Sequence, residues 1–599
     1  MNKKKIFFIL FILISNFGYS QQLLPSFFQW DTASSRFPVT NLHFNTDSGL
    51  VQFAILSDRT GGMNPGVYED AVQKANLLQP QFIMSVGDLI NGYSTDEQLV
   101  GAQWKEFNDI LSPLTVPFFY VPGNHDISNA WMQQEWERRY GKAHYYFLYK
   151  NVLFLSINSQ DGGEYGMKEE QVNYFVSIIK KYATVKWTFV FMHQPLWAKK
   201  NTGFEKIEDA LKDRNYTVFA GHTHNYLLSQ RNNRKYFILA TTGGGTGNRG
   251  EKFGEFNHIT WVTLNKQEPS IINIKLDGLV KEDIVDEKIK TAIRPITSGS
   301  WLQVNPFIAA SAHEKNISPA IIFKNPGEYP LRVNGKMPVG NGFQVQPPVI
   351  DVTVPAGSEK KIDYTISGVS SETIDLADLS PIEIELQGEY IINNSSYALP
   401  VKRRLLIDWP HQSVKLAKPI KHVDQIDTAS YIKINYPEHI EEGWDWHGTD
   451  DCAIQFNVSN DNKTVYLAAE IRDDHFIFQP SVNRDKIFVY LEDKSGKPVR
   501  VTILPGKDKP VVDITDLEGN PYPINIACET NVVENTLQLL LKVPLQNVLK
   551  DNQTIRLNIG YADQDDKKSL ECATLFWKPV WKTGQDYQQS GTFIIKPYK

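Results

Sequence analysis

The chain has 599 residues, of which 41% are hydrophobic and 22% charged, and its net charge is −6. This is the composition of an ordinary soluble globular protein, and at roughly 150 residues per domain the length allows about four units, or fewer if one is a large α/β domain. No block of Lys or Arg follows the first five residues. Stable electrostatic binding to nucleic acid is therefore not expected, although a small nucleotide substrate stays open.

The N-terminus has the pattern of an export signal. Three lysines at positions 3–5 precede an apolar run at 6–14, and small residues at 18–20 suit cleavage before Gln21. The apolar run is too short to span a bilayer, and no second candidate membrane segment follows it. The Lys, Asn and Ile content looks bacterial. We therefore expect residues 1–20 to be the signal peptide of a secreted or periplasmic protein with no integral membrane segment.

Five short apolar runs in the first half of the chain each end at a residue that can bind a metal. The runs cover 51–57, 82–87, 118–123, 188–192 and 217–221, and they are followed by Asp58, Asp88, Asn124 with His125 and Asp126, His193, and His222 with His224. Such continuous runs are typical of strands buried on both faces of an α/β core. These sheets bind ligands beyond the carboxyl ends of their strands, so the polar side chains should converge on one crevice.

The donor types in this series indicate the kind of metal. Oxygen and imidazole donors suit Zn, Mn or Fe. No cysteine belongs to this series, which excludes a Cys-type structural zinc site here. A single His or Asp at a strand end is more often a cap or a turn former. Here, however, the residues form an ordered series, and Gly87, Gly123 and Gly221 each precede one of them, which favours a two-metal hydrolytic centre.

These motifs resemble those of the calcineurin-like metallophosphoesterases over roughly residues 48–290. The resemblance implies a four-layer α/β-β/α sandwich that hydrolyses a phosphoester substrate, with monoester and diester preference left open. It also implies two divalent or trivalent metal ions (Zn, Mn or Fe). The first would be held by Asp58, Asp88 and His224, and the second by Asp88, Asn124, His193 and His222.

One position departs from the family pattern. The family usually begins with Asp-x-His, but the third position here is Thr60, and a hydroxyl is a poorer transition-metal ligand than imidazole. Purple acid phosphatases also lack this His and use a Tyr three residues after the bridging Asp. That position is Asn91 in this chain, and the nearest tyrosine is Tyr93. We therefore expect the first metal site to be the weaker one and treat Asn91 as a minor contact.

Three residues are candidates for catalysis without binding metal. By the resemblance, His125 donates a proton to the leaving-group oxygen, or stabilises its charge, and Asp126 orients the His125 ring. Arg59 follows the ligand Asp58, and its guanidinium could clamp the phosphate. An exposed loop arginine without that role is an equally good interpretation of Arg59.

Beyond residue 290 the pattern changes to short strands separated by turns. Residues 293–410 contain frequent prolines between runs such as 320–323 and 350–354, which predicts an immunoglobulin-like β-sandwich. Residues 411–599 predict a second sandwich, with a hairpin formed by 453–458 and 464–471, that resembles family-9 carbohydrate-binding modules.

Glycan binding by this last region is left open. Trp444 and Trp446 could stack on sugars, although such residues are more often core aromatics. Asp473 and Asp474 could hold calcium, although a solvated turn is more common. The three cysteines Cys452, Cys528 and Cys572 allow one disulfide or serve as small buried hydrophobes.

The sequence thus predicts a multidomain chain: a signal peptide (1–20), an α/β metallophosphoesterase domain (21–292) and two all-β sandwich domains (293–410 and 411–599). The predicted activity is hydrolysis of phosphate mono- or diesters at a dinuclear metal centre. Two alternatives remain. One is a binding protein on a metal-compromised phosphoesterase scaffold, and the other is a glycan-targeted phosphatase directed by its C-terminal sandwich.

Overall fold

The structure is a computed structural model, and it describes residues 28–30, 49–265, 268–275, 278–340, 342–369, 373–379, 382–426, 431–436, 439–442, 446–478, 484–506, 509–551, 553–564, 572–578 and 591–595. The predicted signal peptide and Trp444 lie outside these residues. The chain divides into two compact units, Met1–Thr297 and Ser298–Lys599. No helix of the described residues is both long and apolar enough to cross a membrane.

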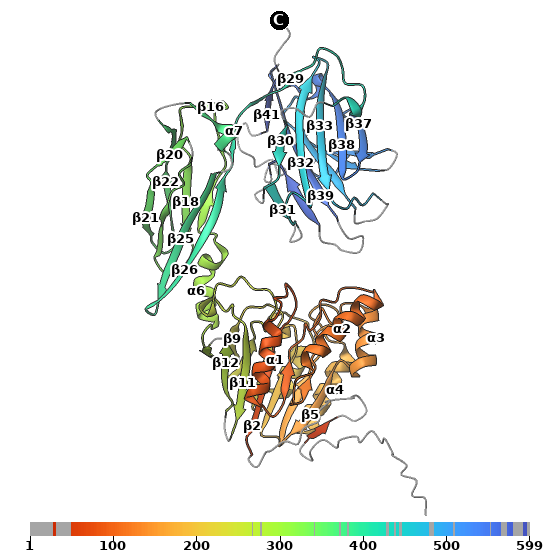
Figure 1. Ribbon diagram of the computed structural model, residues 1–599, viewed down its shortest axis with the longest axis vertical. Coiled ribbons are helices and arrows are strands. Elements are labelled where there is room, and N and C mark those ends of the chain that lie inside the picture. Colours follow the sequence, from red (N-terminus) through yellow and green to blue (C-terminus); the bar gives the residue numbers. More distant parts are fainter. Residues whose placement is uncertain are drawn as a thin grey trace, which may run out of the picture. The chain divides into compact units, whose positions relative to one another are not determined.

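The first unit contains two β-sheets (Figure 1). In spatial order, the seven-stranded sheet consists of β1 (Phe28–Trp30), β5 (Tyr145–Tyr149), β6 (Val152–Ser156), β7 (Trp187–Phe191), β8 (Tyr216–Ala220), β10 (Arg234–Ile238) and β9 (Leu227–Arg231). The six-stranded sheet consists of β13 (Gly278–Lys281), β12 (Ser270–Lys275), β11 (His258–Leu264), β2 (Val51–Leu56), β3 (Ile83–Ser85) and β4 (Phe118–Phe119).

Aromatic side chains hold the two sheets face to face. Phe53 and Phe82 of the six-stranded sheet stack at 5.2 Å, and both meet Phe154 of the seven-stranded sheet edge-on, at 5.5 and 5.3 Å. These rings are fully buried. Because each buries a large apolar area and also gains from ring geometry, the inter-sheet core strongly favours this face-to-face packing.

Helices cover the outer face of each sheet. The covering helices are α1 (Val67–Leu78), α2 (Glu97–Leu111), α3 (Ala130–Tyr140), α4 (Glu169–Lys181) and α5 (Phe204–Leu211), and the later helix α6 spans Glu287–Ser298. Buried residues of α1 and α2 join the core of the six-stranded sheet, whereas those of α4 and α5 pack on Leu153, Val190 and Val218 of the other sheet. The predicted four-layer α/β-β/α arrangement is therefore confirmed.

Strand direction determines where the loops between the layers meet. The strands β2, β3 and β4 are parallel, and so are β6, β7, β8 and β10. The predicted hairpin after the Gly-Asn-His-Asp motif is present as antiparallel β5 and β6. Because parallel strands end at the same edge of a sheet, the loops that follow β2, β3, β4, β7 and β8 can contribute to one site.

The second unit is almost entirely β-structure, which confirms the predicted multidomain fold class. Its N-terminal part contains β14 (Leu302–Val304), β15 (Phe307–Ile308), β16 (His313–Glu314), β17 (Asn316–Ile317), β18 (Ala320–Asn325), β19 (Leu331–Lys336), β20 (Phe343–Gln346), β21 (Val349–Val354), β22 (Ser358–Asp363), β23 (Thr365–Gly368), β24 (Ile374–Asp375), α7 (Leu376–Leu379), β25 (Ile382–Ile392), β26 (Ser395–Leu405) and β27 (Ile407–Asp408). Along β25, buried Ile382, Ile384 and Leu386 alternate with exposed Glu383 and Glu385. This alternation is typical of a strand with one face in a core and one in water.

The C-terminal part packs two larger sheets around a shared apolar core. It contains β28 (His411–Gln412), β29 (Val414–Lys415), β30 (Ile432–Ile434), β31 (Ile440–Glu442), β32 (Cys452–Asn460), β33 (Thr464–Asp473), β34 (Lys486–Glu492), β35 (Pro498–Leu504), β36 (Val511–Thr515), β37 (Ala527–Val533), β38 (Thr536–Pro544), α8 (Leu545–Val548), β39 (Thr554–Asp563), β40 (Ala573–Phe576) and β41 (Thr592–Ile594). The predicted hairpin is confirmed as antiparallel β32 and β33. The predicted boundaries at residues 292 and 410 stay predictions.

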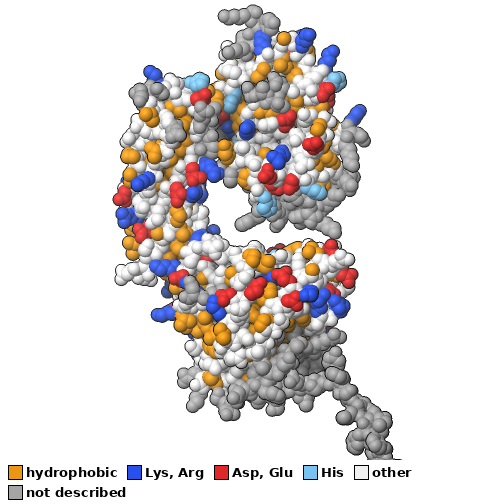
Figure 2. All heavy atoms as spheres, in the orientation of Figure 1, with side chains coloured by type: hydrophobic (Ala, Val, Ile, Leu, Met, Phe, Trp, Pro, Cys, Tyr) orange, Lys and Arg blue, Asp and Glu red, His pale blue; other side chains and the backbone are white. Residues whose placement is uncertain are grey.

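Several sequence alternatives in this region are resolved. Trp446 packs against the sandwich core and its indole N–H donates to the Cys452 carbonyl at 3.0 Å, so it is a core aromatic. All three cysteines are free thiols. Asp473 does not lie in a solvated turn, because it is fully buried, and its carboxylate lies within 4.8 Å of those of Asp485 and Asp563. Figure 2 shows acidic and basic side chains interspersed over the visible face of each unit.

Candidate metal centre

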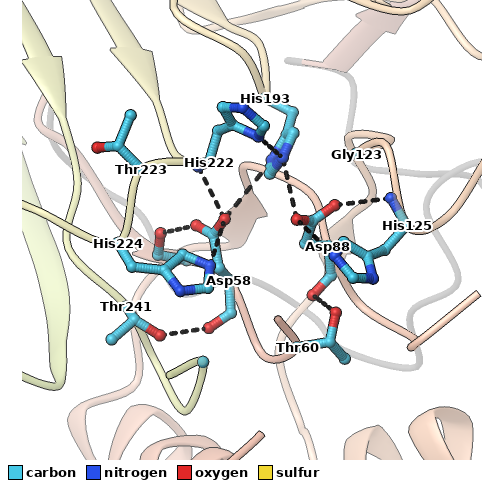
Figure 3. A network of polar contacts seen from close by, with 12 residues as sticks. Asp58, Thr60, Asp88, Gly123, His125, His193, His222, Thr223, His224 and Thr241 are labelled. Atoms are coloured by element: carbon cyan, nitrogen blue, oxygen red, sulfur yellow. Dashed lines mark hydrogen bonds and ion pairs between the residues drawn. The ribbon is translucent and has the colours of Figure 1, made fainter. Parts of the chain in front are cut away.

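The predicted metal-binding side chains come together where the strands end. Asp58 follows β2, Asp88 follows β3, His193 follows β7, and His222 and His224 follow β8; Figure 3 shows their side chains pointing toward one another. Asp88, His222 and His224 have positive φ values of 56°, 75° and 50°. Such values are uncommon for residues other than glycine and recur at binding sites, where the surrounding structure holds the backbone in place.

Backbone amides orient the two carboxylates. The amide of His222 donates to Asp58 Oδ1 at 2.8 Å, and the amide of His125 donates to Asp88 Oδ1 at 3.0 Å. Asp58 is fully buried and Asp88 is 2% exposed. Because a buried charge is costly unless it is compensated, these two carboxylates create a strong preference for positive charge beside them.

Carbonyl groups fix the orientation of two of the histidine rings. His193 Nδ1 lies 2.9 Å from the Val86 carbonyl, and His224 Nδ1 lies 2.6 Å from the Gly245 carbonyl. A carbonyl only accepts, so each Nδ1 carries the proton and each Nε2 faces the centre as a potential ligand atom. His193 Nε2 lies 3.1 Å from Asp88 Oδ2, and His224 Nε2 lies 3.5 Å from Asp58 Oδ1.

These side chains form two groups of donors that share one carboxylate. Asp88, His193 and His222 have ligand atoms within 4.8 Å of one another, and so do Asp58, Asp88 and His224. Asn124 supplies a further donor, because its Oδ1 is buried and accepts no hydrogen bond from the described residues, while its Nδ2 donates to the Tyr93 hydroxyl at 2.8 Å. A buried amide oxygen without a hydrogen bond is well suited to a cation. The donor set could therefore hold two metal ions, with Asp88 belonging to both groups of donors.

The pKa values in the protein alone follow the same electrostatics. Burial alone would lower the pKa of His193, but the charge of Asp88 and its hydrogen bond to the ring raise it to about 9. Burial would raise the pKa of Asp58, but the hydrogen bond with His224 and the charge of His193 bring it below its usual range. The pKa of His222 falls to about 4 through burial and the neighbouring His193 charge. The carboxylates thus remain anionic and draw positive charge to the centre.

Thr60 stands where the family usually has a histidine. Its side chain is hydrogen-bonded to backbone carbonyls of the loop after β3. Its hydroxyl donates to the Ile90 carbonyl at 2.9 Å and lies 3.3 Å from the Asp88 carbonyl. Thr60 is fully buried, and its side chain braces the loop that carries Asp88. The donor group around Asp58 is therefore built without a side chain from position 60.

His125 lies at the same centre but belongs to neither donor group. Its Nδ1 lies 2.7 Å from the Asn91 carbonyl, its Nε2 lies 3.9 Å from Asp88 Oδ2, and its side chain is 22% exposed. Asn91 O rather than Asp126 holds the ring, so the predicted orienting role of Asp126 is wrong. Asn91 makes its contact through its backbone, which side-chain motifs do not reveal.

Asp126 is instead a fully buried brace between two loops. Its Oδ1 accepts from the amides of Leu89 and Ile90 at 2.8 and 3.2 Å, and its Oδ2 accepts from the Gly123 amide at 2.8 Å. Burial and the charge of Asp88 raise the pKa of Asp126 to about 7. Its side chain therefore joins the backbone that follows Asp88 to the loop at Gly123.

The structure also contradicts the predicted phosphate clamp at Arg59. The guanidinium is 4% exposed, forms an ion pair with Glu106 of α2 and donates to the Leu89 carbonyl at 3.2 Å. Arg59 is therefore neither a clamp nor an exposed loop residue, because its buried guanidinium is paired with the exposed Glu106 carboxylate.

Tyr93 is a site residue that sequence reasoning did not assign. Its hydroxyl accepts the hydrogen bond from Asn124, and its ring meets the His125 ring edge-on at 4.8 Å. Tyr93 is 63% exposed, so it stands at the entrance to the centre. The only sequence signal was its position five residues after Asp88 in a motif-bearing loop.

Comparison with known proteins agrees with the resemblance that the motifs predicted. Residues 43–226 match the family model described as calcineurin-like phosphoesterase. A dimetal phosphatase from Danio rerio is similar in structure, with 12% identity, a TM-score of 0.30 and coverage of 38% of this chain and 98% of that protein. A search of curated protein sequences returned no match.

Carbohydrate-binding proteins are also among the similar solved structures. A family-9 carbohydrate-binding module from Caldicellulosiruptor kristjanssonii, in complex with cellotriose, has 12% identity and a TM-score of 0.24, with coverage of 32% of this chain and 95% of that one. A putative carbohydrate-binding protein from Bacteroides uniformis has 7% identity and a TM-score of 0.22, with coverage of 31% and 98%.

Proposed function

We propose that the first unit, in which residues 43–226 match calcineurin-like phosphoesterases, is an exported metal-dependent phosphoesterase that hydrolyses phosphate mono- or diesters. The observation that carries the proposal is the pair of donor groups that share Asp88. Supporting it are the buried Asn124 oxygen without a hydrogen bond and the two imidazoles whose Nδ1 atoms face carbonyls.

Seven ligand positions divide between two ions in this proposal. Asp58, Asp88 and His224 would hold the first ion, and Asp88, Asn124, His193 and His222 the second. Carboxylate, amide and imidazole donors together suit Zn, Mn or Fe. When bound, such a pair of ions activates a water for attack on phosphorus and stabilises charge on the phosphoryl oxygens.

His125 is the proposed proton donor to the leaving-group oxygen. Because the Asn91 carbonyl accepts the Nδ1 proton, the second proton of the charged ring is at Nε2. Partial exposure of the side chain leaves that nitrogen accessible to a substrate. Tyr93 contributes indirectly, since its hydroxyl accepts a hydrogen bond from Asn124 Nδ2 and would keep the amide oxygen free to hold the second ion.

Metal analysis combined with turnover tests this function. The wild-type protein should contain divalent or trivalent metal and should hydrolyse an aryl phosphate monoester or diester in a substrate panel. Asp88→Asn should lose both metal and turnover, because it removes the charge shared by the two donor groups. Asp70→Asn makes the same chemical change in a partly exposed helical ion pair with Lys74 and should retain both.

The alternative of a metal-compromised binding protein makes the opposite prediction. Such a protein would bind phosphoesters in a calorimetric titration, yet would not hydrolyse any of them with Zn, Mn or Fe supplied. Retained turnover in Asp88→Asn would instead mean that the chemistry occurs elsewhere in the chain.

Glycan recognition by residues 411–599 is a separate proposal that targets the enzyme to its substrate. It rests on the predicted sequence pattern, and Trp446 does not support it, because its indole is engaged with the core. A glycan array probed with the full chain and with a chain ending after residue 300 should give signals only for the full chain. Equal signals from both would assign any sugar binding to the first unit.

A further inference from the structure

A pocket of about 490 Å³ adjoins the proposed metal centre and is lined by several segments of the first unit. Residues 222–225 form one wall and include His222 and His224, residues 245–249 of the glycine-rich loop form the second, and helix α6 contributes Lys290, Ile293 and Thr297. Pockets of roughly 300–1,000 Å³ are typical of small-molecule sites. His222 and His224 belong both to the proposed donor groups and to the pocket lining. A substrate bound at the proposed metal centre would therefore extend into this pocket.

An internal ion pair holds the walls together without contributing net charge. The Arg249 guanidinium binds Glu255 through Nε at 2.9 Å and donates through Nη1 to the Thr297 carbonyl of α6 at 2.9 Å. Burial raises the pKa of Glu255, but the hydrogen bonds from Arg249 outweigh this effect and lower it, so the pair stays ionised. Arg249 thus serves as a strut between the loop and α6, and its positive charge is balanced.

Lys290 is a second cation in this pocket. Unlike Arg249, it has no carboxylate partner among the described residues. Among the described residues its ammonium makes no hydrogen bond or ion pair, although the side chain is half-buried. Burial lowers the pKa of Lys290, which means that the ammonium gains from any anion that replaces lost water. A partly desolvated cation of this kind is costly unless a ligand pairs with it.

Thr246 provides a second polar group of the pocket that has no hydrogen-bond partner among the described residues. Its Oγ1 is buried in the pocket lining. Buried hydroxyls in folded proteins are nearly always hydrogen-bonded, so an exception in a pocket indicates a ligand atom. Lys290 and Thr246 come from different segments, and together they offer an ammonium and a hydroxyl to one group.

We propose that this pocket recognises a second anionic group on the substrate, so that the enzyme prefers phosphoesters that also carry a phosphate or a carboxylate. The inference rests on the proposed phosphoesterase function of the adjoining centre. The ammonium of Lys290 pairs with the second anion and the Thr246 hydroxyl donates to it. The ligand class is therefore a small organic phosphate with two separate negative groups.

A matched set of substrates tests the preference by kinetics. The set comprises phenyl phosphate, which lacks a second anion, 3-carboxyphenyl phosphate and 1,3-phenylene bisphosphate. The wild type should have a KM about tenfold to hundredfold lower for at least one of the two charged esters, as expected for hydrogen bonds to charged groups. The ester with the lower KM, carboxylated or bisphosphorylated, identifies the second anion that the pocket prefers.

Variants assign the effect to the pocket. Lys290→Met keeps the length of the side chain and should remove the KM advantage while leaving phenyl phosphate turnover unchanged. Thr246→Val should reduce the advantage by a smaller factor. Lys288→Met is the matched control, because Lys288 is an exposed lysine of the same helix, and it should behave as wild type.

A binding measurement separates this inference from the proposed activity. Isothermal titration with phenylphosphonate and 3-carboxyphenylphosphonate, which are not hydrolysed, should show tighter binding of the carboxylated ligand by wild type and no such difference for Lys290→Met. Absence of any turnover with this binding difference intact would refute the phosphoesterase and keep the pocket. Equal affinities in wild type, or equal effects of the Lys290 and Lys288 variants, would refute the pocket.

Discussion

His125 differs from the other histidines of the centre in the atom it offers. Its Nδ1 is held by the Asn91 carbonyl, and its Nε2 faces the accessible side of the centre at 3.9 Å from Asp88. His193 and His224 are instead held by carbonyls with their Nε2 atoms directed at carboxylates. A ring placed in this way can move a proton without holding a metal.

His125→Ala should therefore leave metal content nearly unchanged and lower kcat. Proton donation of this kind typically contributes 10²–10⁴-fold, and it matters most for poor leaving groups. The loss should be near that range for an alkyl phosphoester and much smaller for a nitrophenyl ester. Equal losses on both esters would indicate electrostatic stabilisation instead, and loss of metal would make His125 a ligand.

Thr60 has a structural role in the loop that follows the proposed ligand Asp58. Because its hydroxyl donates to the Ile90 carbonyl, Thr60→Val should cost about 1 kcal/mol of folding free energy, measured by urea unfolding, without changing metal content.

We also propose that the first metal, which lacks a ligand from position 60, is the more easily removed. Graded chelation followed by elemental analysis should release one equivalent before the other. Simultaneous release of both would contradict the unequal sites.

At the scale of elements, the loop after β4 depends on a close approach between two strand ends. A Cβ placed on Gly123 would lie 2.1 Å from Asp88 Oδ1 and 2.4 Å from the Asp88 nitrogen, so a side chain there displaces the carboxylate shared by both donor groups. The glycine of the Gly-Asn-His-Asp motif is thus required by packing against the neighbouring loop.

Gly123→Ala should accordingly lower both metal content and thermal stability. Gly101→Ala is the matched control, because Gly101 lies inside α2 with open space around its Cβ position. Alanine in a helix is favoured over glycine by up to about 1 kcal/mol, so this variant should raise Tm slightly and keep full metal content. A Gly123→Ala protein with normal metal content would show that the loop can shift without harm.

The carboxylates buried between strands of the C-terminal sandwich predict a pH dependence. Burial and the charge of Asp473 raise the pKa of Asp485 to about 7. Because this pKa is raised above its unfolded value of about 4, the associated stability is complete below pH 4 and is lost as pH rises toward 7.

Hydrogen exchange should reveal this loss in the strands around the cluster. Peptides from β33 and β39 should exchange faster at pH 8 than at pH 5.5, after correction for the intrinsic rate. Asp485→Asn should lower protection overall, because its carboxylate accepts from the Ile477 and Gln564 amides, but should flatten the pH dependence. An unchanged slope in the variant would place the titrating group elsewhere.

At the scale of the whole molecule, the proposed chemistry is confined to the first compact unit. The proposed ligands, His125 and the residues of the anion pocket all precede Ser298, where the second unit begins. A chain of residues 21–300 should therefore fold and retain kcat/KM on small phosphoesters within about twofold of the full chain. A folded but inactive truncation would mean that the second unit helps to form the active site.

The sequence by itself determined the order of strands and ligands in the first unit. Continuous apolar runs indicate buried strands. A potential ligand directly after such a run can be recognised from adjacent residues alone. Asp58, Asp88, His193, His222 and His224 could be placed together for this reason. The alternating strands and the hairpin of β32 and β33 were readable for the same reason, because side-chain period is a property of adjacent residues.

Only the tertiary structure decided which partner each polar group takes. Arg59 follows the proposed ligand Asp58 in sequence, yet its guanidinium binds Glu106, which lies 47 residues away on α2. Asp126 follows His125, yet it binds amides of the Asp88 loop, while the Asn91 backbone carbonyl holds the His125 ring. A charged or polar side chain can reach several acceptors from one position, and folding selects among them by burial and by long-range contacts that local sequence does not encode.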